Sequence, residues 1–243
     1  MIESSRWPVH AVLGRVHGLP LSSRGREFCA NRCIDPEVAF MFGVRTVKAL
    51  TVDPEPFSAT ELSRVTAFQR FLRSNGESLV FPWVDLSGNT LGWKARALSS
   101  KAFTIVVSDY GKWYNPLFGL VPDVAMNRFR SLRAAVLVEG ELDQLAFSGV
   151  GCSVPAMAVG TSGATARQVE WLARFCRTVF LMFDNDAAGR AAASKQFYRF
   201  QRVGVRPVLV EYAAKDPNDL VQAGEQYYRS VVEFIDSTAK MCS

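Results

Sequence analysis

Apolar segments alternate with amphipathic segments through the second half of the chain. Uninterrupted apolar runs are the expected strands, at residues 134–138, 155–159, 178–183 and 206–212. The segments between and after them have helical patterning, at residues 142–148, 164–175, 187–203 and 218–234. Strands that are apolar on both faces are typical of a parallel sheet covered by helices on each side. From about residue 131 the pattern therefore predicts an α/β fold, a four-stranded parallel sheet with flanking helices.

The first 130 residues have a different, mixed pattern. Three short strands are expected, at residues 78–84, 90–98 and 104–107, with a turn at 85–89 between the first two. Asp35 and Pro36 are typical of a helix start, and the capping box Ser58-Ala59-Thr60-Glu61 predicts a helix that reaches about residue 71. We therefore expect two domains, a smaller basic α+β subdomain over residues 1–130 and the parallel sheet over residues 131–243.

Two segments lack a clear pattern. Residues 116–123 are typical of a linker-like loop. The first 30 or so residues mix Gly, Pro, Arg and Ser without periodicity, so we expect them to be partly disordered.

Charge is divided unevenly between the two parts. Residues 1–130 hold 16 Lys and Arg against 11 Asp and Glu, whereas residues 131–243 hold 12 of each kind. All of the net charge of +5 therefore lies in the first part. This distribution suits a basic surface for a polyanion such as nucleic acid, beside a separate acidic site. An ordinary solvated basic face is the simpler alternative.

The composition favours a cytoplasmic protein. No apolar run reaches the roughly 18 residues of a membrane span, and the N-terminus lacks the layout of a secretory signal. The five cysteines are odd in number and scattered, which is typical of a reducing compartment rather than of a disulfide framework. No membrane partner is expected.

Acidic side chains follow three of the four predicted parallel strands. They are Glu139 and Asp143 after the first strand, Asp184 and Asp186 after the third, and Asp216 and Asp219 after the fourth. Because the carboxyl ends of parallel strands meet at one edge, these acids are expected to gather there. Each acid also has an ordinary explanation as a helix cap or a first-turn residue. Their joint position at one edge is harder to explain in that way.

Grouped carboxylates repel one another unless a cation lies between them. Mg²⁺ or Mn²⁺ suits such a group, because hard cations prefer oxygen ligands and keep waters that a phosphate can displace. Zinc is disfavoured, since these segments contain no Cys or His. The remaining set of His10, His17, Cys29 and Cys33 has poor ligand spacing, with the two cysteines at i and i+4 of an expected helix. Gly140 and Gly189 would let the backbone approach a phosphate closely.

These motifs resemble the TOPRIM domain of primases, topoisomerases and some repair nucleases. The resemblance covers about residues 131–235 and is carried by Val138-Glu139-Gly140-Glu141-Leu142-Asp143, by Phe183-Asp184-Asn185-Asp186-Ala187-Ala188-Gly189 and by Lys215-Asp216-Pro217-Asn218-Asp219. Shorter segments ahead of it resemble the basic subdomain of the DnaG-type primase core, bacterial or phage. They are residues 33–37, 42–44, 79–83, Gly88, residues 91–96 and Lys112-Trp113-Tyr114-Asn115, and Gly160-Thr161-Ser162 matches the Gly-Thr turn after the second parallel strand.

The resemblance implies a role for each matched position. Glu139, Asp184 and Asp186 would be catalytic and bind metal, with Asp143, Asp216 and Asp219 as further metal-site residues. Lys94, Arg96, Lys112, Asn115 and Gly140 would contact the nucleotide or the nucleic acid. One family ligand is in doubt, because Asn218 stands where the family has the second acid of its Asp-Pro-Asp segment.

The resemblance also implies a function, which is synthesis of RNA primers on single-stranded DNA from ribonucleoside triphosphates. The expected enzyme is a primase-type nucleotidyltransferase, that is, a DNA-directed RNA polymerase. We expect the core to stand without the family's zinc module before it and without its helical tail and helicase segment after it. We therefore expect a separate template-recognition module and a replicative helicase as partners, and a phage or plasmid origin. Two alternatives stay open, a TOPRIM nuclease and a non-catalytic nucleic-acid-binding replication accessory protein.

Overall fold

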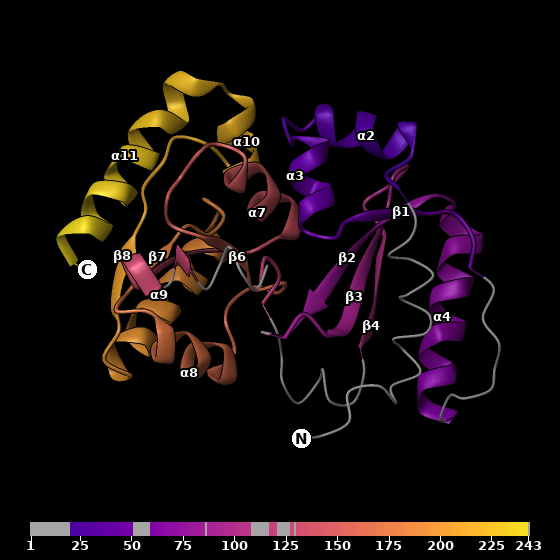
Figure 1. Cartoon of the computed structure of the whole chain (residues 1–243), viewed down its shortest axis with the longest axis horizontal. Helices are drawn as coiled ribbons and strands as arrows, with labels where there is room; N and C mark the ends of the chain where they lie inside the picture. The colour runs from indigo at the N-terminus through magenta and orange to yellow at the C-terminus, as the bar shows by residue number, and fades with distance from the viewer. Residues whose placement is uncertain are drawn as a thin grey trace.

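The described part of the chain forms two four-stranded sheets that lie side by side (Figure 1). The computed structural model describes residues 20–50, 59–85, 87–107, 117–120, 127–128 and 130–242. Within these residues, no helix is long and apolar enough to cross a bilayer. Elements up to β4 build one side of the molecule in Figure 1, and elements from β5 onwards build the other. The division into domains at residue 131 stays a prediction.

The first sheet is antiparallel throughout. Its strands are β1 (Arg45–Val47), β2 (Ser78–Val84), β3 (Thr90–Ala97) and β4 (Phe103–Val107), in that spatial order. The accompanying helices are α2 (Ser23–Ala30), α3 (Pro36–Met41) and α4 (Ala59–Asn75). Helix α4 covers one face, where Phe68 packs edge-on against the fully buried Trp93 with 5.4 Å between ring centroids. Successive residues of β3 therefore point to opposite faces: Trp93 and Ala95 pack in the cluster beneath α4, and Lys94 and Arg96 are turned towards the second sheet.

The second sheet is parallel, as predicted. Its strands are β5 (Ala134–Val138), β6 (Ala156–Ala158), β7 (Thr178–Leu181) and β8 (Arg206–Leu209), in the order β6-β5-β7-β8. Its helices are α7 (Glu141–Ser148), α8 (Ala166–Phe175), α9 (Ala187–Arg202), α10 (Pro217–Gln222) and α11 (Glu225–Cys242). Alternate residues of β5 belong to two different hydrophobic clusters, one beneath α7, α10 and α11 and one beneath α8 and α9. Helices thus cover both faces, which explains why every residue of β5 is apolar and buried.

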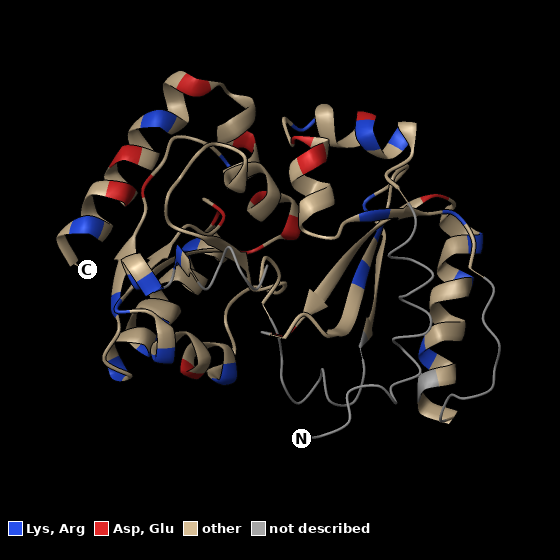
Figure 2. Cartoon of the chain, in the orientation of Figure 1, with Lys and Arg blue, Asp and Glu red and all other residues tan. Residues whose placement is uncertain are grey.

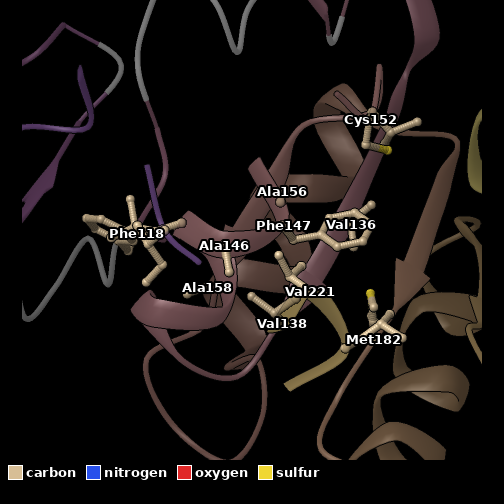
Figure 3. Packing of buried hydrophobic residues seen from close by; sticks show 14 of the residues in the cluster. Phe118, Val136, Val138, Ala146, Phe147, Cys152, Ala156, Ala158, Met182 and Val221 are labelled. Carbon is tan, nitrogen blue, oxygen red and sulfur yellow. The ribbon is translucent and has the colours of Figure 1, made fainter. Parts of the chain in front are cut away.

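One hydrophobic cluster runs through both halves of the molecule (Figure 3). It joins residues of α2, α3 and β2 to Phe118, to β5 and α7, and to α10 and α11. Phe118 is 1% exposed and its ring meets that of Phe81 edge-on, with 5.8 Å between centroids. The backbone of Phe118 also exchanges two hydrogen bonds of 3.0 Å with Ala158 at the edge of the second sheet. The relative position of the two sheets is therefore set by shared apolar packing.

One expectation for the irregular segments is wrong. Residues 117–120 are not a linker-like loop, because Leu117, Phe118 and Leu120 are buried in the core. Within the N-terminal 30 residues, residues 23–30 form α2, whereas residues 1–19 lie outside the described residues, so the expected partial disorder stays a prediction. Ser22 caps this helix by accepting a hydrogen bond from the amide of Gly25, a local signal that needs no apolar periodicity.

Cys29 and Cys33 do not lie at i and i+4 of one helix, contrary to the expectation. Cys29 is in α2 and buried in the core, whereas Cys33 lies beyond the helix end, exposed and with φ of 52°. The two side chains are therefore not one turn apart on a helix. His10 and His17, like the predicted capping residue Ser58, lie outside the described residues.

Candidate active site

The two central strands of the parallel sheet bring the first pair of acids together. Strand β5 ends at Val138 and is followed by Glu139, while β7 ends at Leu181 and leads to Asp184. The backbone amide of Asp184 donates a hydrogen bond of 3.2 Å to Oε1 of Glu139. The predicted convergence of these two carboxylates at the carboxyl edge of the sheet is therefore what the structure contains.

The electrostatics of this pair are unfavourable without a counter-charge. Burial raises the pKa of Glu139, and the carboxylate of Asp184 raises it further. Burial likewise raises the pKa of Asp184, followed by the charges of Asp216 and Asp186. Oδ1 of Asp184 is buried and has no hydrogen-bond partner among the described residues. Such an oxygen is available to a ligand that brings positive charge.

Asp143 and Asp216 form a second acidic pair beside the first. Burial, then the charges of Asp216 and Asp184, raises the pKa of Asp143 to about 7. Asp143 accepts hydrogen bonds of 3.2 Å from the backbone amides of Gly140 and Asn218. Asp216 caps α10 by accepting 2.7 Å from the amide of Asp219. Asp143 thus fastens α7 to α10 in addition to contributing charge.

Asp186 and Asp219 lie at the exposed margin of the group. Asp186 caps α9, accepting a hydrogen bond of 2.8 Å from the amide of Gly189. Asp219 is in the first turn of α10 and 3.5 Å from Nε2 of Gln222. The ordinary capping explanation therefore holds for Asp186 and Asp216, and it does not compete with a role in metal binding, because one carboxylate oxygen remains for a ligand.

The two glycines of the acidic motifs are required by the protein itself. A Cβ at Gly189 would lie 2.0 Å from the carbonyl oxygen of Asp184, so no other residue fits beneath the acidic loop. A Cβ at Gly140 would lie 2.7 Å from Oδ2 of Asp143. The backbone of Gly189 therefore lies close to Asp184, and that of Gly140 lies close to Asp143. That a phosphate can approach these glycines stays a prediction.

Asn218 explains how the motif departs from the family pattern. It is 7% exposed, and its Nδ2 donates 2.7 Å to the carbonyl oxygen of Arg32 in the other half of the molecule. Its Oδ1 accepts 3.1 Å from Gln222. The amide therefore joins α10 to the turn after α2, a contact that requires a donor and that a carboxylate could not make.

A basic strand faces the acidic edge. Nζ of Lys94 on β3 lies 2.8 Å from Oε2 of Glu141 in the first turn of α7, and Glu141 is only 4% exposed. Burial lowers the pKa of Arg96, as does nearby Arg32, while Glu141 and Asp143 oppose the shift. Figure 2 shows the basic positions of β3 opposite the acidic residues around α7. Lys94 is therefore already paired, whereas Arg96 has an Nε without a partner among the described residues.

A cavity of about 500 Å³ separates the two sides. Its wall includes side chains of both charges, from β3, α7, α10 and the turns beside them, namely Arg32, Lys94, Arg96, Lys101, Asp143, Lys215, Asp216 and Asp219. Phe103, Gly140 and Glu141 also line it. A space of this size, with cations facing carboxylates, suits a ligand that carries phosphates and needs a metal.

Several residues of the site were not predicted from the sequence. Glu141 was not assigned a role, although an acid two residues after Glu139 in an apolar segment is a signal that could have identified it. Arg32, Lys101 and Phe103 reach the cavity only through the fold. Lys112 and Asn115, which were predicted to bind nucleotide or nucleic acid, lie outside the described residues.

The acidic residues present fit a divalent cation of the hard class. The nearby donors are carboxylate oxygens, and the partnerless Oδ1 of Asp184 beside Glu139 is the place where a cation would relieve the repulsion. Among the described residues, no three His, Cys, Asp or Glu side chains already form a ligand cluster. The assignment of Glu139, Asp143, Asp184, Asp186, Asp216 and Asp219 as metal ligands stays a prediction.

Comparison with known proteins first identifies the class of fold. Residues 136–221 match the Toprim-like family. The structure of the zinc-binding and RNA polymerase domains of the Aquifex aeolicus primase matches with a TM-score of 0.70 and 22% identity, covering 93% of this chain and 60% of that one. A DnaG primase catalytic domain bound to single-stranded DNA matches with a TM-score of 0.68 and 19% identity, covering 93% and 78%. The fold is therefore that of the DnaG primase catalytic core.

Sequence relatives include proteins named DNA primase. The DNA primase of Treponema pallidum is 25% identical over 230 residues, which cover 87% of this chain and 37% of the relative. The resemblance to the DnaG-type primase core with its TOPRIM domain is thus confirmed. This chain spans little more than a third of the length of that relative.

Proposed function

We propose that this chain synthesises RNA primers on a single-stranded DNA template from ribonucleoside triphosphates. The observation that carries the proposal is the cavity between the acidic edge of the parallel sheet and the basic strand β3. Joining two nucleotides needs a metal site for the reacting phosphate and a cationic surface for the polyanionic strand. The cationic wall and part of the acidic group, Asp143, Asp216 and Asp219, line this cavity, whereas Asp184, whose charge acts on Asp143, lines a separate pocket. The fold is shared with the DnaG catalytic core.

The acidic edge of the sheet and the cationic wall of the cavity have different tasks in this reaction. A 3′-hydroxyl loses its proton to solvent and its oxygen forms a new bond to the α-phosphorus of the incoming nucleotide. The bond from that phosphorus to the bridging oxygen breaks, and pyrophosphate leaves with the electron pair. Glu139 and Asp184, with Asp186 at the margin, would hold Mg²⁺ or Mn²⁺. When bound, such a cation stabilises the charge that develops on the reacting oxygens. Arg96 and Lys101 would hold the phosphates on the opposite wall, and Lys94 contributes from its ion pair with Glu141.

The test is formation of ribonucleotide dimers and short primers on a single-stranded template, with Mg²⁺ or Mn²⁺ titrated in. Asp184→Ala should reduce the rate at least 100-fold, on the order of a lost electrostatic contact in a transition state. Glu170→Ala is the matched control, because Glu170 is an exposed acid on α8. Far-UV circular dichroism of both variants checks that they remain folded. Full activity of Asp184→Ala would overturn the assignment of the metal site.

The two alternatives give different outcomes in the same set of assays. A TOPRIM nuclease would cut DNA with metal and without nucleoside triphosphates. A non-catalytic accessory protein would bind single strands equally well as wild type and as Asp184→Ala, with no product from either. Primer synthesis that depends on Asp184 and on ribonucleotides would exclude both.

The proposal includes two further proteins. The Aquifex structure contains a zinc-binding domain beside the RNA polymerase domain. We therefore include a separate zinc-binding template-recognition module and a replicative helicase in the priming assay. If wild type makes no primer even with both partners present, the primase proposal fails.

A further inference from the structure

Phe103 is an aromatic side chain that the fold leaves open at the cavity wall. It is 58% exposed at the start of β4, the edge strand of the antiparallel sheet. The other phenylalanine of the wall, Phe81, is 1% exposed and belongs to the core. An exposed aromatic ring at the wall of a polar cavity is available to stack on a flat ligand.

The sheet register places Phe103 beside the basic residues. Arg96 of β3 is directly opposite Phe103 of β4, and directly opposed residues of antiparallel strands share a face. Lys94 is on this face too, two residues from Arg96, and its Nζ lies 5.1 Å from the centroid of the Phe103 ring. Lys101, in the turn between β3 and β4, completes the cationic rim of the cavity. A ring bordered by cations is the arrangement that proteins use to bind nucleic acid bases and phosphates together.

The position of Lys94 is fixed independently of any ligand. Its ammonium group is held 2.8 Å from Glu141, so it neutralises that buried acid and contacts the Phe103 ring at the same time. The carboxylate of Glu141 on α7, the ammonium of Lys94 on β3 and the ring of Phe103 on β4 thus form a row of successive contacts along the cavity. It holds the ring next to the acidic edge, while more than half of the phenylalanine stays accessible.

We propose that Phe103 is a stacking platform for a nucleobase, with Arg96 and Lys101 receiving the phosphate attached to it. The inference rests on the proposed function and deepens it, because it assigns one binding position in the cavity to a base. That base belongs either to the incoming nucleotide or to the template strand. Both sources offer the same chemistry, a flat ring joined through a sugar to a phosphate.

The experiment compares ligands with and without a base. One arm measures the dissociation constant of a fluorescent single-stranded oligonucleotide and of the same strand made of abasic sites. The other arm uses ATP and inorganic tripolyphosphate in competition. Phe103→Leu should weaken binding of the ligand that has a base by about fivefold or more, the effect of losing one base–aromatic stack. It should leave the matched ligand without a base unchanged, and Phe103→Trp should restore the affinity.

Ile105→Ala is the matched control, because Ile105 is also exposed on the same face of β4 but does not line the cavity. A base-dependent loss in the oligonucleotide arm assigns the platform to the template, and a loss in the ATP arm assigns it to the nucleotide. Equal weakening of both members of each pair would mean a packing role and would overturn the proposal. No weakening, or no binding by wild type in either arm, would overturn it as well.

The result does not depend on catalysis. Binding is measured without turnover, so absence of primer synthesis by wild type contradicts the proposed function and leaves the base dependence readable. If the enzyme makes primers and Phe103→Leu weakens ligands with and without a base equally, only the stacking platform is contradicted.

Discussion

At the scale of single residues, the carboxyl group of Asp184 has more negative neighbours than hydrogen-bond donors. Burial raises its pKa, and Asp216 and Asp186 raise it further, with Lys215 as a partial counter-charge. Its Oδ1 is buried without a partner among the described residues. An oxygen in this state destabilises the folded protein until a cation or a donor reaches it.

The variant Asp184→Asn therefore tests whether Asp184 contributes to metal binding without being needed for folding. The wild type should gain about 2–3 kcal/mol of unfolding free energy when free Mg²⁺ or Mn²⁺ exceeds its dissociation constant about 100-fold. The variant should lose that gain, and with EDTA it should be at least as stable as wild type, because one of the repelling charges is gone. Urea unfolding with and without metal measures both effects. A variant that keeps the metal-dependent gain, or that is much less stable in EDTA, would contradict this reasoning.

The sequence predicts the position of a site residue well when that residue directly follows a strand of the parallel sheet. The acids after β5, β7 and β8 could be located because parallel strands deliver their ends to one edge. The structural contact of Asn218 with Arg32 could not be located, because it joins residues 186 positions apart. Phe103 illustrates the same limit, since the apolar pattern of β4 does not tell which of its residues the fold leaves exposed.

At the scale of elements, one ion pair connects the two sheets at the cavity. Lys94 of β3 and Glu141 of α7 lie 2.8 Å apart, and neither side chain is more than 17% exposed. Oε1 of Glu141 has no hydrogen-bond partner among the described residues. In a place so poorly hydrated, each charge depends on the other.

Removal of one member should cost far more than removal of both. Glu141→Leu leaves the ammonium of Lys94 facing an apolar side chain and should destabilise the protein by about 3–5 kcal/mol. The double variant Lys94→Met with Glu141→Leu should recover much of that loss, as apolar replacements of buried ion pairs do. Urea unfolding of the single and double variants gives the coupling free energy.

The exposed ion pair Glu225–Arg229 on α11 supplies the control for this cycle. Its removal should change the unfolding free energy by less than about 0.5 kcal/mol, because water already solvates both charges. A coupling between Lys94 and Glu141 as small as that would mean that the pair does not hold β3 against α7.

The elements themselves differ in how far their sequences define them. The strands of the parallel sheet could be predicted because their residues are apolar on both faces, although β8 ends at Leu209 rather than at residue 212. Strand β1 and helix α2 could not be predicted. Strand β1 has only three residues, which pair with β2, and α2 has eight residues of low hydrophobicity, so neither has a periodic signal. Helix α11 reaches Cys242, beyond the expected end, because its later turns still bury Ile235 and Ala239.

At the scale of the whole molecule, the cavity exists because two sheets share one core. Phe118 contacts both, through its ring against Phe81 and Phe42 and through its backbone against Ala158. Gly119 makes this crossing possible, with φ of 97° and no space for a Cβ beside the carbonyl oxygen of Ala156. The segment that the sequence pattern favours as a linker is instead the place where the two halves are fastened together.

The two halves should therefore unfold together. Urea unfolding of wild type, followed by tryptophan fluorescence and by far-UV circular dichroism, should give one transition with coincident midpoints. Phe118→Ala should lower the unfolding free energy by about 3–5 kcal/mol, since it empties a fully buried aromatic site between the sheets. Phe234→Ala, at a 45% exposed position on α11, should change it by less than about 1 kcal/mol. Two separate transitions in wild type, or a loss at Phe118 no larger than that at Phe234, would mean that each half is stable by itself and that the geometry of the cavity is set elsewhere.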